Sequence, residues 1–319
     1  MKLVTYEGLR EAKNGRALGV VEGEAVVNVA EAIDWGGLLP KPEPALRGAI
    51  ETLEAASGAP FDMVDLISRG PDYLAALGAV ASAAARTGSE PGLVTPLSGV
   101  RLRAPIARPP KIVCVGLNYA DHAHEQGIEP PATPVLFLKA SNTVIGPEDP
   151  IRLPPNTTEP DYEAELAVVI GKGGSRIPQK RAWEHVAGYT ILNDVTARDM
   201  QHGDKQWFRG KSCDTFAPTG PWIVTPDEIP DPHALGISLT LNGETMQDSN
   251  TSNLIYKIDF LVSYLSQSLT WEPGDLISTG TPPGVGVFRK PQVFIKPGDE
   301  ITVRVEDIGT LTNRVVAPY

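Results

Sequence analysis

From about residue 105 onward, short apolar runs alternate with turns that are rich in Gly and Pro. Each run spans only a few residues, which suits a strand and is too short for a helix. Gly and Pro are costly inside helices, so 31 Gly and 30 Pro in 319 residues argue against a helical bundle. We therefore expect a β-rich sandwich or barrel with few helices. The expected strands are Ile112–Val115, Val135–Leu138, Leu166–Ile170, Trp222–Val224, Ile237–Leu241 and Ile301–Val305, and the expected helices are Arg181–Val186 and Leu254–Ser266.

The first hundred residues have a different pattern, in which strand-like runs precede amphipathic stretches. Glu22-Gly23-Glu24 lies between two of these runs and is typical of a hairpin turn. The expected strands are Leu3–Tyr6, Ala17–Val21 and Ala25–Val29, and the expected helices are 45–58, 61–70 and 73–87. A segment punctuated by Gly and Pro then leads to residue 105. We therefore expect an α+β protein with a smaller α/β domain over residues 1–104 and a β-rich domain over residues 105–319.

Net charge restricts the partners of the chain. Lys and Arg number 28 and Asp and Glu number 39, which gives a formal net charge of −11. An acidic surface repels phosphate backbones and anionic membranes, so we expect neither nucleic acid nor membrane as a partner. If the substrate is an acid, the site must supply positive charge locally, from a metal or from a few Lys and Arg side chains.

Cysteine usage and the first residues indicate the compartment. The two cysteines, Cys114 and Cys213, do not form the disulfide framework of a small secreted protein. Residues 1–7 lack the apolar run of a signal peptide, and no stretch approaches the ~20 apolar residues of a transmembrane helix. We therefore expect a cytoplasmic protein.

The stretch from Asp161 to Gly171 carries two acidic residues into a β-branched apolar run that favours a strand. Successive strand side chains point to opposite faces, so Glu163 and Glu165 share a face with apolar neighbours. Two carboxylates this close repel unless a cation or proton lies between them, and a hard divalent ion would resolve the repulsion. Asp194 ends another strand-like run and offers a third carboxylate. Alone, the pattern is more often that of two exposed glutamates and an Asp that caps the next element.

A second candidate segment follows the strand that ends at Gly116. In a helical turn, His122 and Glu125 lie on one face at spacing i, i+3. A carboxylate orients an imidazole and raises its basicity, so this pair suits general acid–base catalysis. His122 and His124 also form a His-x-His pair, but the other histidines lack the spacing of a zinc motif. The alternative is a short surface helix with ordinary side-chain pairing.

Taken together, these segments resemble the fumarylacetoacetate hydrolase family over about residues 105–315. The resemblance rests on the number and order of the motifs, because each motif alone is weak. The motifs are GLNYADHAHE at 116–125, FLK at 137–139, DYEAE at 161–165, NDVTARDMQ at 193–201, GKSCDTFAP at 210–218 and STGTPPGVG at 278–286.

The resemblance implies a β-rich catalytic fold of the mixed β-sandwich or β-roll type, with a smaller N-terminal domain, in a protein that is usually a homodimer. It implies Mg²⁺, Mn²⁺ or Ca²⁺ bound by Glu163, Glu165 and Asp194. It also implies that His122 and Glu125 form a pair that activates water, on a segment that often closes over the substrate.

Further residues receive roles from the same resemblance. Lys211 is expected to be a catalytic cation that stabilises an oxyanion or enolate. Tyr119, Gln201 and Thr281 are expected to bind the substrate. The members that cleave fumarylacetoacetate carry a further acidic ligand before the histidine segment, where this chain has Leu117-Asn118, so a site of three carboxylates is expected.

The residues around Lys211 resemble bacterial members that act on diketo sugar acids. We therefore expect hydrolytic C–C cleavage of a 2,4-dioxo acid, either an acylpyruvate or a diketo sugar acid, to pyruvate or a related 2-oxo acid plus a carboxylic acid. The metal would act as a Lewis acid on the substrate, and Glu125 and His122 would deprotonate the attacking water.

Two other classes of function stay open at this point. One keeps the metal but changes the reaction, to decarboxylation of oxaloacetate or to isomerisation or hydration of an unsaturated 2-oxo diacid. The other is a metal-dependent binding protein without catalysis. The pair His122 and Glu125 argues against the second, because binding alone does not require a base.

Overall fold

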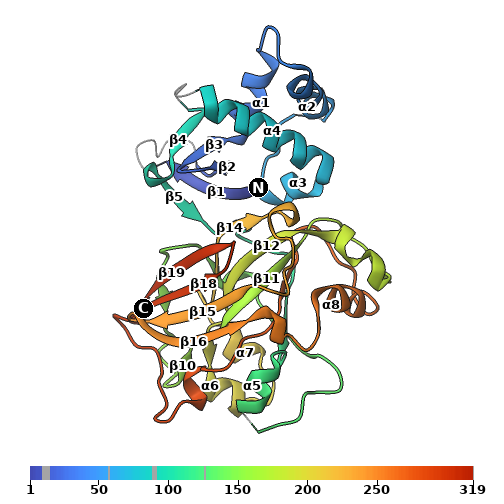
Figure 1. Cartoon of the computed structure of the whole chain (residues 1–319). Helices are drawn as coiled ribbons and strands as arrows, with labels where there is room; N and C mark the ends of the chain where they lie inside the picture. Colours follow the sequence, from blue (N-terminus) through green and yellow to red (C-terminus); the bar gives the residue numbers. More distant parts are fainter. Residues whose placement is uncertain (9–14, 57, 88–91, 126, 319) are drawn as a thin grey trace.

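The computed structural model of the chain describes residues 1–8, 15–56, 58–87, 92–125 and 127–318. A large mixed sheet runs through the molecule, with the N-terminal elements gathered at one end (Figure 1). The main path of this sheet has the strand order β4-β3-β2-β1-β14-β12-β11-β17-β6-β7. A second sheet, in the order β16-β15-β18-β19-β9, contributes to a core that it shares with the central strands of the first.

The N-terminal part combines a strand meander with helices. Its strands are β1 (Lys2–Gly8), β2 (Ala17–Glu22), β3 (Ala25–Asn28), β4 (Val94–Pro96) and β5 (Val100–Arg103), and its helices are α1 (Val29–Gly37), α2 (Pro44–Ala55), α3 (Met63–Ser68) and α4 (Pro71–Thr87). The predicted hairpin is confirmed, since Glu22 pairs with Ala25 across the turn. Helix α1 is not predicted by the sequence pattern. It begins where the side chain of Asn28 accepts the N–H of Glu31 at 3.2 Å, a cap that ends β3 one residue early.

The N-terminal strands continue into the strands of the second part. β1 pairs antiparallel with β14 (Ala217–Val224), and it also pairs with β5. The core that α3 and α4 share with the sheet includes residues of β1 and of the central strands. This continuity does not test a division of the chain near residue 105, which stays a prediction.

Four central strands are buried on both faces. They are β6 (Ile112–Gly116), β11 (Ala164–Ile170), β12 (Val186–Asn193) and β17 (Leu276–Ser278). The edge strand β7 (Val135–Lys139) pairs with β6 and exposes Leu136 and Leu138. Along β11, Leu166 and Val168 belong to one core, whereas Ala167 and Val169 belong to the other. The alternation predicted for this strand is therefore confirmed. A strand buried on both sides is continuously apolar, which makes the charges at its start unusual.

The second sheet and the remaining helices complete the β-rich part. The strands are β9 (Ile151–Arg152), β15 (Gly236–Leu241), β16 (Glu244–Asn250), β18 (Glu300–Val305) and β19 (Gly309–Val316), with short pieces β8 (Val144–Ile145), β10 (Pro160–Asp161) and β13 (Thr196–Ala197). The helices are α5 (Ala120–Glu125), α6 (Arg198–Gly203), α7 (Phe208–Lys211) and α8 (Ile258–Leu265). The predicted α+β class and the predicted strands are confirmed. The helix expected at Arg181–Val186 is a 3₁₀ helix at Gln179–His185, and the helix expected at Leu254–Ser266 is the shorter α8.

Among the described residues, none of the helices combines the length and the apolar character that a membrane crossing requires.

Candidate functional site

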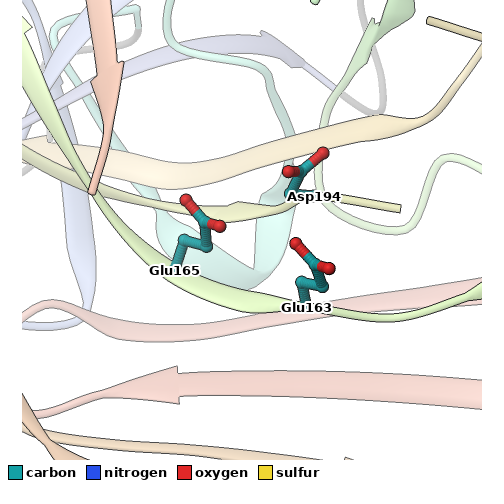
Figure 2. Close-up of side chains that lie close together, drawn as sticks. All are labelled: Glu163, Glu165 and Asp194. Carbon is teal, nitrogen blue, oxygen red and sulfur yellow. The ribbon is translucent and has the colours of Figure 1, made fainter. Parts of the chain in front are cut away.

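Three buried carboxylates meet where β11 begins and β12 ends (Figure 2). The register pairs Ala164 of β11 with Asn193 of β12. Glu163 and Glu165 are the neighbours of Ala164 in sequence, and Asp194 directly follows Asn193, so the three acidic residues come together. The backbone N–H of Asp194 donates to the carbonyl oxygen of Glu163 at 2.9 Å. One ligand oxygen from each of Glu163, Glu165 and Asp194 lies within 4.8 Å of the other two. The antiparallel pairing of two distant segments thus builds the predicted acidic cluster, which we call the acidic triad.

Buried cations surround two members of the triad. The Nζ atom of Lys211 lies 2.8 Å from Glu163 Oε2 and 2.7 Å from Asp194 Oδ2, and it donates to both. Lys139 Nζ donates to the other oxygen of Asp194 at 2.6 Å. Arg198 Nη2 forms an ion pair with Glu163 Oε1 at 2.6 Å. These contacts fix the orientation of both carboxylates.

The charges act on the two glutamates in opposite ways. Burial raises the pKa of Glu163, but Lys211 and Arg198 lower it further than burial raises it, to about 2. Glu165 forms no salt bridge with any described residue, so burial and the repulsion of Asp194 and Glu163 raise its pKa well above the ordinary value. The Ser278 hydroxyl and the N–H of Gly280 (2.9 Å) donate to Glu165 Oε2.

The residues of the triad fit a divalent cation. In the described part of the chain, this buried network contains four carboxyl groups (Asp161, Glu163, Glu165 and Asp194) against three cations (Lys139, Arg198 and Lys211). Glu165 is the carboxyl group without a cationic partner, so its raised pKa favours the protonated form in the metal-free protein, and a bound cation would stabilise the ionised form. Carboxylate oxygens are the ligands that Mg²⁺ and Mn²⁺ prefer. The buried acidic triad can therefore hold a divalent metal of this kind, as predicted.

The predicted acid–base pair lies on α5. His122 Nδ1 lies 3.0 Å from Glu125 Oε2, and the spacing i, i+3 on a helix brings the two side chains together as expected. His122 is buried, while Glu125 is about a quarter exposed. The ring of Phe288 approaches the imidazole, with centroids 5.8 Å apart. We call His122 and Glu125 the dyad.

Hydrogen bonds on both sides hold α5 in place. Asp121 accepts the N–H of His122 at 3.0 Å, and its second oxygen accepts from Ser249 (2.6 Å) and Asn253 (3.0 Å). Just before the helix, Asn118 Nδ2 donates to the carbonyl of Thr279 at 2.7 Å. The helix is thereby tied to β16, to the turn that follows it and to the loop after β17, so the position of the dyad is set by the fold.

One small cavity connects the dyad with the triad. Its volume is about 120 Å³. The residues that line it are Val115, Gly116, Leu117, His122, Phe137, Glu163, Glu165, Arg198, Gln201, His202, Trp207, Lys211, Thr281 and Phe288. Gln201 Oε1 accepts from Arg198 Nη1 at 3.1 Å, which leaves its amide N–H groups as donors toward a ligand. Thr281 Oγ1 accepts from Gln247 at 2.8 Å. The cavity thus combines anionic metal ligands, a cation, hydrogen-bond donors and a base.

The structure gathers most of the sequence-predicted residues but not all of them on the cavity. Asp194 and Glu125 are not among the lining residues, but they contact Lys211 and His122, which line the cavity. Tyr119 lies fully buried in the core, does not line the cavity, and its hydroxyl has no hydrogen-bond partner in the described ranges. Its role as a substrate-binding residue stays a prediction, as do the individual roles of the others.

Three residues that shape the site have no role that the sequence predicts. Lys139 and Arg198 lie in the quoted motifs FLK and NDVTARDMQ, but nothing in the sequence placed them beside the triad. Asp161 accepts the N–H groups of Gly286 (2.7 Å) and Val287 (3.0 Å) and pairs with Arg198 (2.9 Å). It therefore joins the Gly-rich loop to the triad. The motifs marked these residues, and only the three-dimensional contacts gave them roles.

Comparisons with known proteins agree with this site. The profile of the fumarylacetoacetate (FAA) hydrolase C-terminal family matches residues 111–316. The chain is similar to oxaloacetate tautomerase FAHD2A, mitochondrial, from Bos taurus, with 52% identity over 225 residues that cover 70% of this chain and 72% of that protein. It is 45% identical to oxaloacetate tautomerase Fahd2a, mitochondrial, from Rattus norvegicus over 276 residues, which cover 86% of each chain.

Solved structures extend the similarity to the whole chain. Fumarylacetoacetate hydrolase from Exiguobacterium antarcticum has a TM-score of 0.78 and 34% identity and covers 99% of each chain. Maleylpyruvate hydrolase from Sphingobium sp. SYK-6, in complex with manganese(II) and pyruvate, has a TM-score of 0.74 and 29% identity, with 100% of each chain covered. The manganese and pyruvate belong to that protein, but they show that a neighbour with this fold binds a divalent metal and a 2-oxo acid.

Proposed function

The chain belongs to the fumarylacetoacetate hydrolase family, and from this premise we propose that it is a metal-dependent enzyme that interconverts the keto and enol forms of oxaloacetate. The observation that carries the proposal is that His122 of the dyad and Glu163 and Glu165 of the triad line one small cavity. The names of the two relatives at 52% and 45% identity favour this reaction. A cavity of about 120 Å³ also suits a short acid.

The triad would hold Mg²⁺ or Mn²⁺. When bound, the ion supplies positive charge, can be chelated by a 2-oxo acid, and polarises the 2-oxo group as a Lewis acid. Lys211 and Arg198 already neutralise part of the triad, so the site can accept both a cation and an acidic substrate. Gln201 and Thr281 would donate hydrogen bonds to substrate oxygens and set the orientation of the acid.

The dyad would move the proton. The imidazole of His122 takes a proton from C3 of the keto acid, and Glu125 stabilises the imidazolium that forms. The electron pair of the broken C–H bond forms the C2–C3 double bond, and negative charge develops on the C2 oxygen. Lys211 stabilises this charge from its position between Glu163 and Asp194. The imidazolium then returns its proton to this oxygen, which gives the enol and restores the neutral imidazole, so the reaction needs no water.

Hydrolytic cleavage of an acylpyruvate is the second candidate. The similarity to a maleylpyruvate hydrolase over the full chain favours it, as does a dyad that could equally deprotonate water. In this reaction hydroxide attacks the 4-oxo carbon, the C3–C4 bond breaks, and the pyruvate enolate is protonated at C3. Decarboxylation of oxaloacetate is the third outcome that the same site could support.

One screen separates the three reactions. Purified protein loaded with Mg²⁺ or Mn²⁺ is mixed with oxaloacetate, with the enol followed by ultraviolet absorbance, and with a set of acylpyruvates, with products identified by mass spectrometry. Tautomerisation gives rapid keto–enol equilibration without loss of carbon. Hydrolysis gives pyruvate and a carboxylic acid, and decarboxylation gives pyruvate and carbon dioxide. A flat result with every compound would contradict the proposed function and favour a binding protein.

Three further expectations accompany the proposal. We propose that the chain forms a homodimer in the cytoplasm and that residues 1–104 form a smaller domain. Light scattering after size exclusion tests the first, and limited proteolysis near residue 105 tests the last.

A further inference from the structure

We infer that Trp207 is a specificity-determining residue, which limits the length of the 2-oxo acid that the cavity accepts. The inference rests on the proposed binding of a 2-oxo acid at the acidic triad. It goes beyond the proposed reaction, because it concerns the part of the substrate that does not react.

Two chemically different groups of residues line the cavity. Charged and hydrogen-bonding residues, among them Glu163, Lys211 and Gln201, form the first group, which we call the charged side. The second group, which we call the apolar side, consists of Val115, Gly116, Leu117, Phe137, Trp207 and Phe288. The carboxylate and oxo groups of a 2-oxo acid need the charged side, so we expect the remainder of the molecule to lie against the apolar side.

The indole of Trp207 forms part of the apolar side and is tightly placed there. A Cβ atom on Gly116 would lie 2.6 Å from Cζ3 and 3.0 Å from Cη2 of the indole, so the ring rests directly on the glycine backbone. The ring also packs edge-on against Phe137, with centroids 5.2 Å apart at 63°. The absence of a side chain at Gly116 is therefore what lets the indole come so close to the cavity.

Trp207 is also linked to the charged side. The N–H of Lys211 donates to the carbonyl oxygen of Trp207 at 3.0 Å, so one helical turn separates the indole from the catalytic cation. The Nζ atom of Lys211 lies 4.9 Å from the centroid of Phe137, the ring that supports the indole. The apolar wall thus begins within a few ångströms of the groups that would bind the acid.

The volume shows why this wall would select by length. Sites for drug-sized ligands usually measure ~300–1,000 Å³, whereas this cavity has about 120 Å³. Each additional methylene of the ligand must therefore find space that the indole occupies. The ring of Trp207 is only partly buried, and removing it enlarges the cavity on the side to which a tail would extend.

The experiment measures affinity for a series of 2-oxo acids that differ only in tail length. Pyruvate, 2-oxobutyrate, 2-oxopentanoate and 2-oxohexanoate are titrated into the Mg²⁺-loaded full-length protein by isothermal calorimetry. The wild type should bind the longer acids progressively more weakly relative to pyruvate. In Trp207→Ala the ratio of 2-oxohexanoate to pyruvate affinity should rise by about ten-fold or more, and Trp207→Phe should lie between the two.

Trp183→Ala provides the matched control. Trp183 is 42% exposed on the surface, lies outside the lining of this cavity, and loses the same ring in the substitution. Its length profile should equal that of the wild type. An equal loss of affinity for all four acids in Trp207→Ala, or an unchanged ratio, would overturn the inference.

The experiments distinguish a failure of the proposed function from a failure of this inference. If the protein binds pyruvate with metal but turns over no oxaloacetate or acylpyruvate, the reaction is wrong while the length profile still decides the role of Trp207. If no 2-oxo acid binds to the metal-loaded wild type, both are wrong.

Discussion

The backbone N–H of Gly284 donates a hydrogen bond to Oε1 of Glu125 at 3.1 Å. This contact joins the Gly-rich loop after β17 to helix α5, two segments that lie far apart in the sequence. The other carboxylate oxygen of Glu125 contacts His122. The loop therefore orients the carboxylate that in turn orients the imidazole.

Substitution of Gly284 should disturb the dyad. Its φ of +101° favours glycine, and a Cβ atom there would overlap the carbonyl oxygen of Met246. The loop must then shift, so Gly284→Ala should lower kcat by about 100-fold. Gly298→Ala is the control, because Gly298 has a similar φ of +97° but open space around it. That variant should lose some stability, of order 1–3 kcal/mol, and keep its kcat. Equal kcat values in the two variants would show that the loop does not position the dyad.

Two members of the triad should respond oppositely to removal of their charge. In metal-free protein, Glu163→Gln breaks buried ion pairs with Lys211 and Arg198 and should cost about 3–5 kcal/mol of stability. Glu165→Gln replaces a carboxyl group that has no salt-bridge partner among the described residues, and it should leave the metal-free stability unchanged or raise it. Both variants should lose the rise in Tm that Mn²⁺ gives the wild type, because each lacks a ligand. Thermal unfolding with and without Mn²⁺ measures both effects, and equal destabilisation of the two apoproteins would contradict this view of the charges.

The raised pKa of Glu165 also predicts a pH dependence. In the unfolded chain Glu165 loses its proton near the ordinary pKa of about 4.3, whereas burial and two neighbouring carboxylates keep it protonated to higher pH in the folded protein. The folded state then binds more protons than the unfolded state, so its stability falls as pH rises. The Tm of metal-free wild type should therefore drop relative to that of Glu165→Gln as the pH rises above the ordinary pKa of a glutamate. A constant difference in Tm would indicate that Glu165 is ionised throughout.

The dyad should matter for catalysis and not for metal binding. His122→Ala removes the base and should lower kcat by roughly 10²–10⁴-fold. Metal affinity measured by calorimetry should stay unchanged, because the three carboxylates of the triad, and not His122, would hold the metal. His124→Ala, an exposed histidine on the same helix, is the control and should keep both properties. Wild-type kinetics in His122→Ala would remove the dyad from the mechanism.

The sequence predicts those parts of the site that depend on local geometry. Alternation along a strand places Glu163 and Glu165 on one face, and helical spacing brings His122 to Glu125, so both pairs follow from the chain itself. The strand-like run that ends at Asp194 offered a third carboxylate, and the family resemblance then implied that it is a metal ligand. The same reasoning predicts most strands, because short apolar runs between Gly and Pro turns have few alternatives.

Contacts between distant segments are not predictable in this way. Lys139 ends β7 and reaches Asp194, which follows β12, although three strands lie between β7 and β12 in the sheet. This contact depends on how the sheet folds in three dimensions. Trp207 reaches the cavity because Gly116, some ninety residues earlier, leaves room for its ring. The apolar pattern does not predict helix α1, because the helix begins at a single capping residue, Asn28, which the pattern does not reveal. Strand order, close backbone approach and capping each require the folded chain.

The central claim is that the triad and the dyad act together as a metal-dependent catalyst on a short 2-oxo acid. The most direct test is the rate of keto–enol equilibration of oxaloacetate, which the ultraviolet absorbance of the enol reports. The rate is measured with Mg²⁺-loaded protein and again after EDTA has removed the Mg²⁺. We predict rapid equilibration with Mg²⁺, a return to the uncatalysed rate after EDTA, and recovery when Mg²⁺ is added back. An unchanged rate after complete metal removal, or no acceleration with Mg²⁺ or Mn²⁺, would contradict the claim.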